Sequence, residues 1–435
     1  MACSGFVDRI RYSLTRASGP APDMSIEKRE ITVIGAGVIG SAIAWRLATQ
    51  GHSVRVLDPE PPGFGGASYG NVGHIAAELV EPLPSPKLLL TFWKELVQFG
   101  GPLHMPMRHW FGLLPWSLRF AMAAFRRAEN TRALAPLVRT ATTDFQQMLE
   151  AFGRTDLLRQ NGHYQIWYGA KAEQAAAAEA AHMATLDIPT APADASWLNV
   201  QAQRAGVDAI AGLHFPTCGH VLDPAEVGKA CADAAKAHGA VFEPVAATKI
   251  ERRGAGLVIT HSAGQINTEA AVVAAGVWSK PLLEAFGLKV PLQPAYGYHV
   301  ELPNEPAQID APILYSDQRL LVTPMAGRLR ASSFMEFSGL HSKVDPRKFT
   351  RLDELLAQVG YPKSDPSRRW RGPRPILPDY LPGLGQVPGQ PIYYAIGHQH
   401  IGLTLAPMTA EVMGRLIDGS HPHIPCDAFD LRRFG

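Results

Sequence analysis

The clearest pattern of apolar and polar positions lies near the N-terminus. Residues 31–34 form a β-branched apolar run typical of a buried strand. Apolar residues then recur three and four positions apart up to about Gln50, and Gly51 stands where a helix would end. Residues 53–57 predict a second strand. The pattern therefore predicts a strand, a helix and a parallel strand in this order.

Three later segments repeat the change from a strand period to a helix period. Residues 220–242 predict strand, helix and strand, with Asp223 as the helix N-cap before Pro224 at the first helical position. Residues 270–274 and 392–396 are apolar strands, each followed by a glycine-containing turn. After the second turn we expect a helix over about residues 406–417.

Two long segments separate these pieces. Residues 290–367 alternate apolar and polar positions, which favours half-buried antiparallel strands. We expect a Rossmann-like α/β domain (28–84, 201–289, 368–432) of the glutathione-reductase type, which starts with a βαβ unit and is interleaved with an α+β substrate domain (85–200, 290–367) that contains an antiparallel sheet.

Composition narrows the class of protein. Of 435 residues, 46% are hydrophobic and 18% are charged, and the net charge is +2, so a soluble globular enzyme is expected and a nucleic-acid partner is not. The four cysteines show no CxxC spacing, and we predict neither disulfides nor a metal site. No apolar stretch reaches the length of a transmembrane helix. We expect residues 1–27 to be a disordered tail.

The localisation that fits this composition is cytoplasmic. One segment, residues 88–125, leaves a second possibility open, because it carries many aromatic residues. These aromatic residues are expected either to cap a core or to contact the inner surface of a membrane: Trp93, Trp110, Phe111, Trp116 and Phe120.

The first strand is followed by a GxGxxG motif. Gly35 permits a tight turn, Gly37 lets the backbone approach a pyrophosphate, and Gly40 lets helix and strand pack closely. The free N–H groups of the helix N-terminus favour the phosphates. Asp58 ends the second strand and is placed to accept hydrogen bonds from a ribose. A purely structural βαβ unit is the alternative. The motif predicts a dinucleotide site but does not separate NAD from FAD.

The segment after the second strand helps to choose between NAD and FAD. The loop GGASYGNVGHI, residues 65–75, is rich in Gly, Ser and Asn, which suits a backbone lying along a flat ring system. Here the sequence resembles the D-amino-acid oxidase-like family of FAD-dependent oxidoreductases, particularly bacterial D-amino-acid dehydrogenases. Ser68, Asn71 and Gly73 match the family's loop along the flavin, whereas His74 stands where the family often carries Gln.

The resemblance implies FAD as the cofactor and extends over nearly the whole chain. The AAGxWS turn at residues 274–279 would pass beside the adenosine half, and the GHQHIGLTLAP turn at residues 397–407 would enclose the pyrimidine end of the flavin. A His-x-His metal site at that turn is disfavoured because no acid or cysteine lies nearby in the sequence. The predicted cofactor contacts are Gly35, Gly37, Val38, Ile39, Gly40, Asp58, Ser68, Asn71, Val72, Gly73, His74, Ala275, Gly276, Trp278, Gly397, His398, Gly402, Leu403 and Thr404.

The chemistry that the resemblance implies needs a clamp for the substrate carboxylate. Arg374, in a WxGxRP segment, is predicted to be this clamp, since arginine binds carboxylates through two parallel hydrogen bonds. His400 is predicted to reach the substrate over the flavin. Tyr296 and Tyr298 are candidates for a second carboxylate contact or a lid, with an aromatic core as the equal alternative.

Three functions remain open at this point. The first is oxidative deamination of a D-amino acid to a 2-oxo acid and ammonia, by hydride transfer from Cα to flavin N5, with electrons passed to a quinone or another acceptor. The second is oxidation of a cyclic imino acid such as cis-4-hydroxy-D-proline, or of glycine or sarcosine. The third is a dinucleotide-binding module without turnover. The sequence does not predict the oligomeric state.

Overall fold

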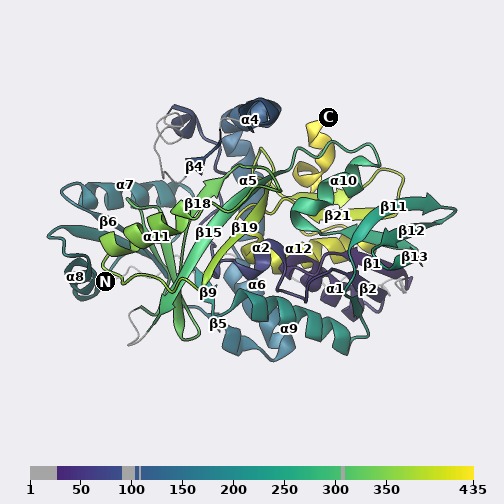
Figure 1. Cartoon of the computed structure of the whole chain (residues 1–435), viewed down its shortest axis with the longest axis horizontal. Helices are drawn as coiled ribbons and strands as arrows, with labels where there is room; N and C mark the ends of the chain where they lie inside the picture. The colour runs from purple at the N-terminus through teal and green to yellow at the C-terminus, as the bar shows by residue number, and fades with distance from the viewer. Residues whose placement is uncertain (1–26, 91–102, 107–108, 305–308) are drawn as a thin grey trace, which may run out of the picture.

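The computed structural model describes residues 27–90, 103–106, 109–304 and 309–435 of the chain (Figure 1). Residues 1–26 of the predicted tail, and Trp93 of the aromatic run, lie outside the described residues.

A six-stranded sheet forms the centre of one half of the molecule. Its strand order is β10–β2–β1–β14–β21–β20, and every neighbouring pair is parallel except β20 and β21. The carboxyl ends of β1, β14 and β21 therefore meet at one edge. The strands are β1 (Glu30–Ile34), β2 (Ser53–Leu57), β10 (Val241–Glu243), β14 (Ala270–Val273), β20 (Gly383–Gln386) and β21 (Ile392–Ile396).

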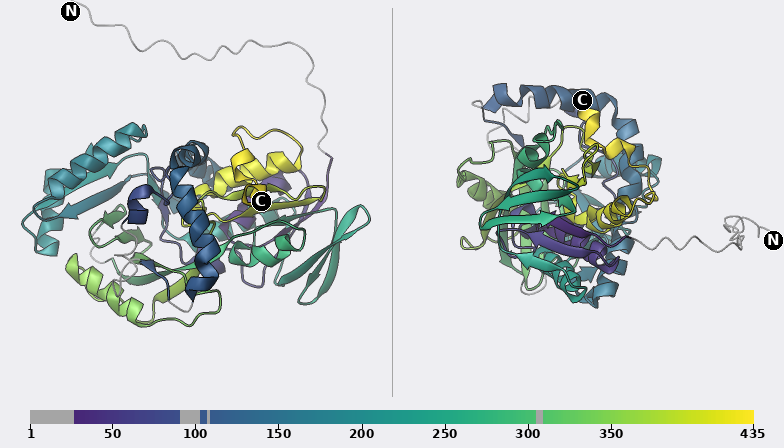
Figure 2. Two further views of the ribbon diagram at one scale, coloured as in Figure 1. Left: turned by 90° about the horizontal axis from the view of Figure 1, so that it is seen from above. Right: turned by 90° about the vertical axis from the view of Figure 1, so that its right-hand side faces the viewer.

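Helices cover one face of this sheet and a small sheet covers the other (Figures 1 and 2). α1 (Val38–Thr49) contacts both α9 (Pro224–Ala237) and α12 (Gly402–Ile417). Alanines at positions 42, 44 and 48 of α1 are buried, so its neighbours can approach closely on two sides. The three-stranded sheet β11–β12–β13 packs on the opposite face through Ile250, Leu257 and Ile259. Its strands are β11 (Ala247–Arg253), β12 (Gly256–His261) and β13 (Gly264–Thr268).

A nine-stranded mixed sheet forms the other half. Eight strands follow the order β19–β15–β18–β17–β16–β6–β8–β7, and β4 pairs with β18. All pairs are antiparallel except β16 with β6 and β18 with β4. The strands are β4 (Leu103–His104), β6 (His163–Tyr168), β7 (Ala191–Pro192), β8 (Ile210–Phe215), β15 (Gln293–Pro303), β16 (Ile313–Tyr315), β17 (Leu320–Met325), β18 (Arg328–Glu336) and β19 (Arg369–Ile376).

This architecture confirms the predicted fold class of a Rossmann-like α/β half interleaved with an α+β half that contains a largely antiparallel sheet. Two strands, however, lie on the other side of the predicted domain boundaries. β8 and β19 belong to the nine-stranded sheet, although residues 201–289 and 368–432 were expected in the dinucleotide-binding half. β19 is held there by pairing with β15 along eight residue pairs.

The remaining elements connect and cover the two halves. A second three-stranded sheet contains β3 (His74–Ile75), β9 (Gly219–Val221) and β5 (Leu158–Arg159). Among the described residues, no helix combines the length and the apolar character needed to cross a bilayer. The other helices are α2 (Gly66–Tyr69), α4 (Trp110–Phe125), α5 (Arg127–Val138), α6 (Ala141–Phe152), α7 (Ala172–Thr185), α8 (Ala195–Ala205), α10 (Ser279–Glu284) and α11 (Arg347–Gln358), with 3₁₀ turns at η2 (Thr155–Leu157), η3 (Gly276–Trp278), η4 (Asp427–Phe429) and η5 (Leu431–Phe434).

Candidate active site

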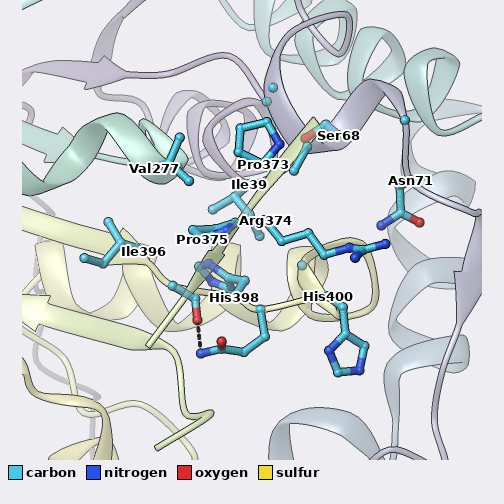
Figure 3. Close-up of a pocket in the computed structure, with 18 of the residues that line it drawn as sticks. Ile39, Ser68, Asn71, Val277, Pro373, Arg374, Pro375, Ile396, His398 and His400 are labelled. Atoms are coloured by element: carbon cyan, nitrogen blue, oxygen red, sulfur yellow. Dashed lines mark hydrogen bonds between the residues drawn. The ribbon is translucent and has the colours of Figure 1, made fainter. Parts of the chain in front are cut away.

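A cavity of about 1300 Å³ lies between the two sheets and continues to the carboxyl ends of β1, β14 and β21 (Figure 3). Its walls include residues from every segment in which the sequence predicted a site residue, except β15. Seventeen of the predicted site residues line it: Gly35, Gly37, Val38, Ile39, Asp58, Ser68, Asn71, Val72, Ala275, Gly276, Trp278, Arg374, Gly397, His398, His400, Gly402 and Leu403.

The first turn has the geometry of a phosphate-binding loop. Gly35 adopts φ +110°, and a Cβ atom there would lie 2.5 Å from the carbonyl oxygen of Ala274. A Cβ at Gly40, which does not line the cavity, would collide with the carbonyl oxygen of Gly35. α1 begins after Gly37, which has no side chain to cap it, and its first residues, Val38 and Ile39, line the cavity. A pyrophosphate fits this position.

Asp58 stands at the end of β2, where a ribose would lie. Its two carboxylate oxygens accept hydrogen bonds from the backbone N–H groups of Ala36, at 2.7 Å, and Glu60, at 2.9 Å. Burial nevertheless raises the pKa of the Asp58 carboxyl above its ordinary value, and the two backbone hydrogen bonds partly oppose this rise. The carboxylate thus holds the glycine turn in place and still borders the cavity.

The loop after β2 runs along the middle of the cavity. The Ser68 hydroxyl oxygen accepts a hydrogen bond from the N–H of Val38 at 3.0 Å, which joins the loop to the start of α1. The Asn71 side chain accepts from the N–H of Gly73 at 2.8 Å and fixes the next turn. Gly73 and His74 lie behind the cavity wall and do not line it.

The turn after β14 closes the other end. Gly276 begins a 3₁₀ turn with Trp278, and Trp278 is half exposed beside the cavity. A Cβ at Gly66 would lie 3.5 Å from the Trp278 ring, so the two segments enclose the same space. Ala275 has a side chain small enough to leave that space open.

The C-terminal turn differs from its predicted form in one respect. α12 begins at Gly402 and not near Ala406, and Pro407 lies inside the helix. Gly397 adopts φ +66°, and His398 is buried with its Nε2 atom 3.1 Å from the hydroxyl of Thr409. Burial lowers the pKa of His398 to about 3. The helix start, which has no side-chain cap, therefore faces the cavity.

Thr404 is the one predicted contact of this turn that does not line the cavity. Its hydroxyl oxygen accepts a hydrogen bond from the N–H of Ala76 at 3.1 Å. It thereby ties the first turn of α12 to the segment that follows β3.

Arg374 and His400 extend into the part of the cavity between the two sheets (Figure 3). The Arg374 guanidinium donates one hydrogen bond, at 2.9 Å, to the carbonyl oxygen of Phe334. Among the described residues it makes no ion pair, and burial lowers its pKa. His400 is open to the cavity although protein surrounds it; burial, then Arg374 and His74, lower the pKa of its imidazole to about 4.

The structure does not bring Tyr296 and Tyr298 to the cavity. They lie on one face of β15, where Tyr298 contacts Phe349 of α11 with ring centroids 5.4 Å apart. The Tyr298 hydroxyl donates to Glu336 at 3.0 Å. Gly297, between them, points to the opposite face, and a side chain there would overlap the Arg374 guanidinium. Strand alternation therefore separates the two tyrosines from Arg374.

Several cavity residues had no signal in the sequence. Phe334 lies beside Arg374 in a left-handed conformation with φ +69°. Tyr380 also has a positive φ, and its ring centroid is 5.9 Å from that of His400. Burial raises the pKa of the Tyr380 hydroxyl. Only the WxGxRP segment, which contains Trp370, indicated a residue of this group. Other lining residues that no motif linked to the site include Trp116, Phe120, Ser332, Ser333, Met335 and Phe337.

The fold and the cavity together define the class of dinucleotide-binding proteins. The cavity runs from the glycine turn at Gly35 to the nine-stranded sheet that carries Arg374. The family model described as FAD dependent oxidoreductase matches residues 30–416, so the chain belongs to this family and its cofactor is FAD. The chain is 29% identical to a D-amino-acid oxidase of Bradyrhizobium diazoefficiens, over 94% of this chain and 99% of the relative. It is 28% identical to a D-amino acid dehydrogenase of Dechloromonas aromatica, over 90% and 97% of the two chains.

Solved structures agree on the fold. Glycine oxidase from Geobacillus kaustophilus superposes with a TM-score of 0.73 at 20% identity, over 93% of this chain and 98% of that chain. L-proline dehydrogenase from P. horikoshii gives a TM-score of 0.69 at 20% identity, over 94% and 98% of the chains.

The residues present fit FAD. Gly35, Gly37 and the start of α1 would hold the pyrophosphate, and Asp58 the adenosine ribose. The loop residues Ser68, Gly70, Asn71 and Val72 and the turn at Gly397 border the space for the isoalloxazine ring. The start of α12 provides partial positive charge beside that space.

Proposed function

We propose that the protein oxidises a D-amino acid to a 2-oxo acid and ammonia and passes the electrons to a quinone. The observation that carries this proposal is Arg374, a half-buried cation that lines the cavity next to the FAD site and has no carboxylate partner among the described residues. An uncompensated buried charge is costly, so the site favours a ligand that supplies a carboxylate. The relatives named D-amino-acid oxidase and D-amino acid dehydrogenase support the choice of substrate class.

The other side chains around Arg374 suit the remaining needs of the reaction. FAD, when bound, accepts the hydride from the substrate Cα. His400 is neutral at pH 7 because its pKa is lowered to about 4, so its ring nitrogen can accept a hydrogen bond from the substrate amine. Tyr380, Phe334 and Phe337 close the apolar wall and exclude water from the reacting carbon.

The proposed quinone acceptor is supported by the surface of α4. This helix contains a single charged residue, Arg119, and no acid. Trp116 and Phe120 of the same helix are buried against the cavity. The exposed apolar residues form a stripe on the other side of the helix: Trp110, Phe111, Leu114, Leu118, Met122 and Phe125. We propose that this stripe rests in the interface of a phospholipid membrane, where a quinone is dissolved.

A cyclic imino acid such as cis-4-hydroxy-D-proline is the second candidate substrate. The observation in its favour is His400, which is open to the cavity and uncharged near Arg374. Such a histidine can hydrogen-bond a ring hydroxyl while the arginine holds the carboxylate. Glycine and sarcosine are smaller members of the same class, and the structural likeness to a glycine oxidase keeps them in the test.

A substrate panel with a dye acceptor tests the proposal. The purified flavoprotein is mixed anaerobically with D-alanine, L-alanine, glycine, sarcosine and cis-4-hydroxy-D-proline, and loss of the oxidised flavin absorbance is followed. We expect the fastest bleaching with a D-amino acid. Faster bleaching by the hydroxyproline would favour the second candidate, and no bleaching by any member would overturn the proposal. Equal turnover with oxygen and with the dye would overturn the choice of a quinone.

A further inference from the structure

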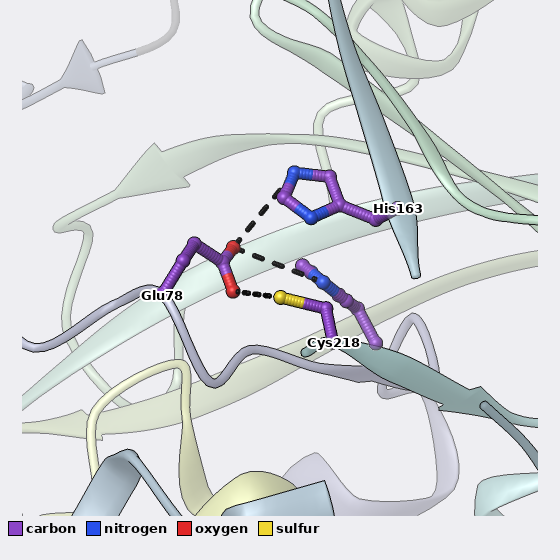
Figure 4. A group of neighbouring side chains, drawn as sticks. Glu78, His163 and Cys218 are labelled. Carbon is purple, nitrogen blue, oxygen red and sulfur yellow. Dashed lines mark hydrogen bonds and ion pairs between the residues drawn. The ribbon is translucent and has the colours of Figure 1, made fainter. Parts of the chain in front are cut away.

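A second cluster of chemically active side chains lies behind the loop that follows β2 and borders the cavity, here called the cofactor loop. Glu78, His163 and Cys218 converge on one point, and His74 joins them from β3 (Figure 4). The four come from different parts of the chain: β3 and the segment after it, β6, and the turn between β8 and β9. The cluster therefore connects the segment behind the cofactor loop to the nine-stranded sheet.

Most of the donor atoms lie slightly farther apart than in a tetrahedral coordination shell. One donor atom from each of the four residues lies within 4.8 Å of all the others. Cys218 Sγ is 2.9 Å from Glu78 Oε2, and the Nε2 atoms of His74 and His163 are 3.8 Å and 3.9 Å from Glu78 Oε1. Ligand bonds of about 2.0–2.3 Å place tetrahedral donors about 3.5 Å apart, so small side-chain rotations would complete the shell.

The surroundings leave the histidines, but not the cysteine, short of partners: the Cys218 thiol donates to Glu78, and its Sγ accepts from the backbone N–H groups of Ala77 and Glu78. Glu78, His74 and His163 are buried, and Cys218 is fully buried. In the described part of the chain, His74 Nε2 has no hydrogen-bond partner. The His163 ring is held by stacking on Phe215, with centroids 4.5 Å apart and planes 20° apart. A buried imidazole nitrogen aimed at a carboxylate and a thiol, and not hydrogen-bonded, is costly unless a ligand binds there.

We propose that His74, Glu78, His163 and Cys218 bind a zinc ion. Two imidazoles, a thiolate and a carboxylate are ligands that Zn²⁺ accepts in tetrahedral geometry. A thiolate and a carboxylate together balance the two positive charges, so the complex is neutral and can remain buried. Four protein ligands leave no open position, and the ion acts as a structural link between the two halves. This inference departs from the sequence prediction of no metal site and is independent of the proposed reaction.

Metal content of the flavoprotein tests this inference. The wild-type holoprotein is exposed to ZnCl₂, freed of loose metal with a weak chelator, and analysed by plasma mass spectrometry. We expect about one zinc ion per chain. We expect Cys218→Ser and Glu78→Gln each to lower the retained zinc at least tenfold, with bound FAD measured in parallel to show that the fold persists.

Cys231→Ser is the matched control, because Cys231 is also a fully buried free thiol but lies in α9, outside the cluster. It should retain the wild-type zinc content. Wild-type protein that retains no zinc would overturn the inference, as would zinc that is retained equally by all four proteins. If Cys218→Ser does not fold, the Glu78→Gln result decides. If Cys218 and Glu78 form only a hydrogen-bonded pair without metal, the wild-type protein will retain no zinc.

Discussion

Three arginines of the nine-stranded sheet differ in what balances their charge. Arg330 is paired with Glu301 at 2.7 Å, and Arg371 with Glu336 at 3.1 Å. Arg374, three residues after Arg371 on the same strand, has the carbonyl oxygen of Phe334 in place of a carboxylate. The first two arginines stabilise the fold through internal ion pairs. The third is arranged to bind an anion that comes from outside.

Replacing Arg374 with Leu should raise KM for the amino acid about 100-fold and leave bound FAD in place. The physical reason is the loss of charge-assisted hydrogen bonds to the substrate carboxylate, about 3 kcal/mol in total. Steady-state kinetics with a dye acceptor, together with the flavin absorbance of the purified variant, measures both effects.

Arg369→Leu is the control for this substitution. Arg369 lies on the same strand but pairs with Asp353 and does not line the cavity. Its KM should stay within about twofold of the wild type. An unchanged KM in Arg374→Leu would remove Arg374 from the substrate site.

Sequence motifs located Arg374 but not its partners in space. The WxGxRP segment marks the arginine, whereas Phe334 of β18 approaches it only because β19 pairs with β15 and β15 with β18. Tyr296 and Tyr298 illustrate the same limit. Their side chains share one face of β15, and nothing in the local sequence states which face of a strand buried on both sides meets the cavity.

At the scale of elements, local patterns predicted the dinucleotide-binding pieces closely. The predicted strands at 31–34 and 53–57 and the helix to about Gln50 agree with β1, β2 and α1 to within a residue. The helix α12 was predicted to begin near Ala406, one residue before Pro407. Leu403 and Leu405 are buried against the core, and this packing extends the helix back to Gly402 despite the missing N–H of the proline.

Asp58→Ala should weaken FAD binding by roughly 10- to 100-fold. The variant loses both the acceptor for a ribose hydroxyl and the hydrogen bond from Ala36 that shapes the phosphate turn, each about 1 kcal/mol or somewhat more. Equilibrium titration of the apoprotein with FAD, followed by flavin fluorescence, measures the change. Asp58→Asn keeps an acceptor oxygen for the turn and should lose less affinity. Full occupancy in Asp58→Ala would show that the acid is only structural.

The apolar stripe of α4 gives a second prediction at the scale of an element. The triple variant Leu114→Ser, Leu118→Ser and Met122→Ser should reduce binding to vesicles of anionic phospholipid at least tenfold, since each buried side chain adds about 1–2 kcal/mol. These three side chains are 54%, 57% and 60% exposed, so the fold should persist. Co-sedimentation with the vesicles is the measurement.

Val200→Ser with Val344→Ser is the matched control, because both valines are more than half exposed but lie outside α4. This double variant should bind vesicles like the wild type. Equal binding by the triple variant and the wild type would contradict a membrane role for the stripe.

At the scale of the molecule, the chain passes between the two halves several times. The sequence separates strand-rich from helix-rich segments, but it does not state that β8 and β19 join the nine-stranded sheet, because their partners β6 and β15 lie about 45 and 75 residues away along the chain. The same holds for the proposed zinc ligands. They are scattered between residues 74 and 218 with no motif spacing and meet only in the folded protein.

The folded protein should lose stability as the pH falls below about 6.5. His299 and His398 are only 3% and 4% exposed. Burial lowers the pKa of His398 to about 3. Burial, together with the nearby Arg330, lowers the pKa of His299 well below its ordinary value. Both remain neutral in the fold, whereas in the unfolded chain they take up protons below the ordinary histidine pKa of 6.5. The unfolded state then binds more protons, so the free energy of unfolding falls with pH, by up to about 1.4 kcal/mol per pH unit for each histidine.

Urea unfolding at several pH values, with FAD present at a fixed saturating concentration, measures this loss. His398→Gln removes one of the two titrating groups. The free energy of unfolding should then fall less steeply between about pH 6.5 and 4, by the contribution of one histidine. His423→Gln, at an exposed histidine, should leave the slope unchanged. Carboxylates contribute in a different window, because Glu336 has its pKa lowered to about 2 from 4.5 and loses its stabilising effect only below pH 4.5. A wild-type slope in His398→Gln would mean that this imidazole is already protonated in the folded protein.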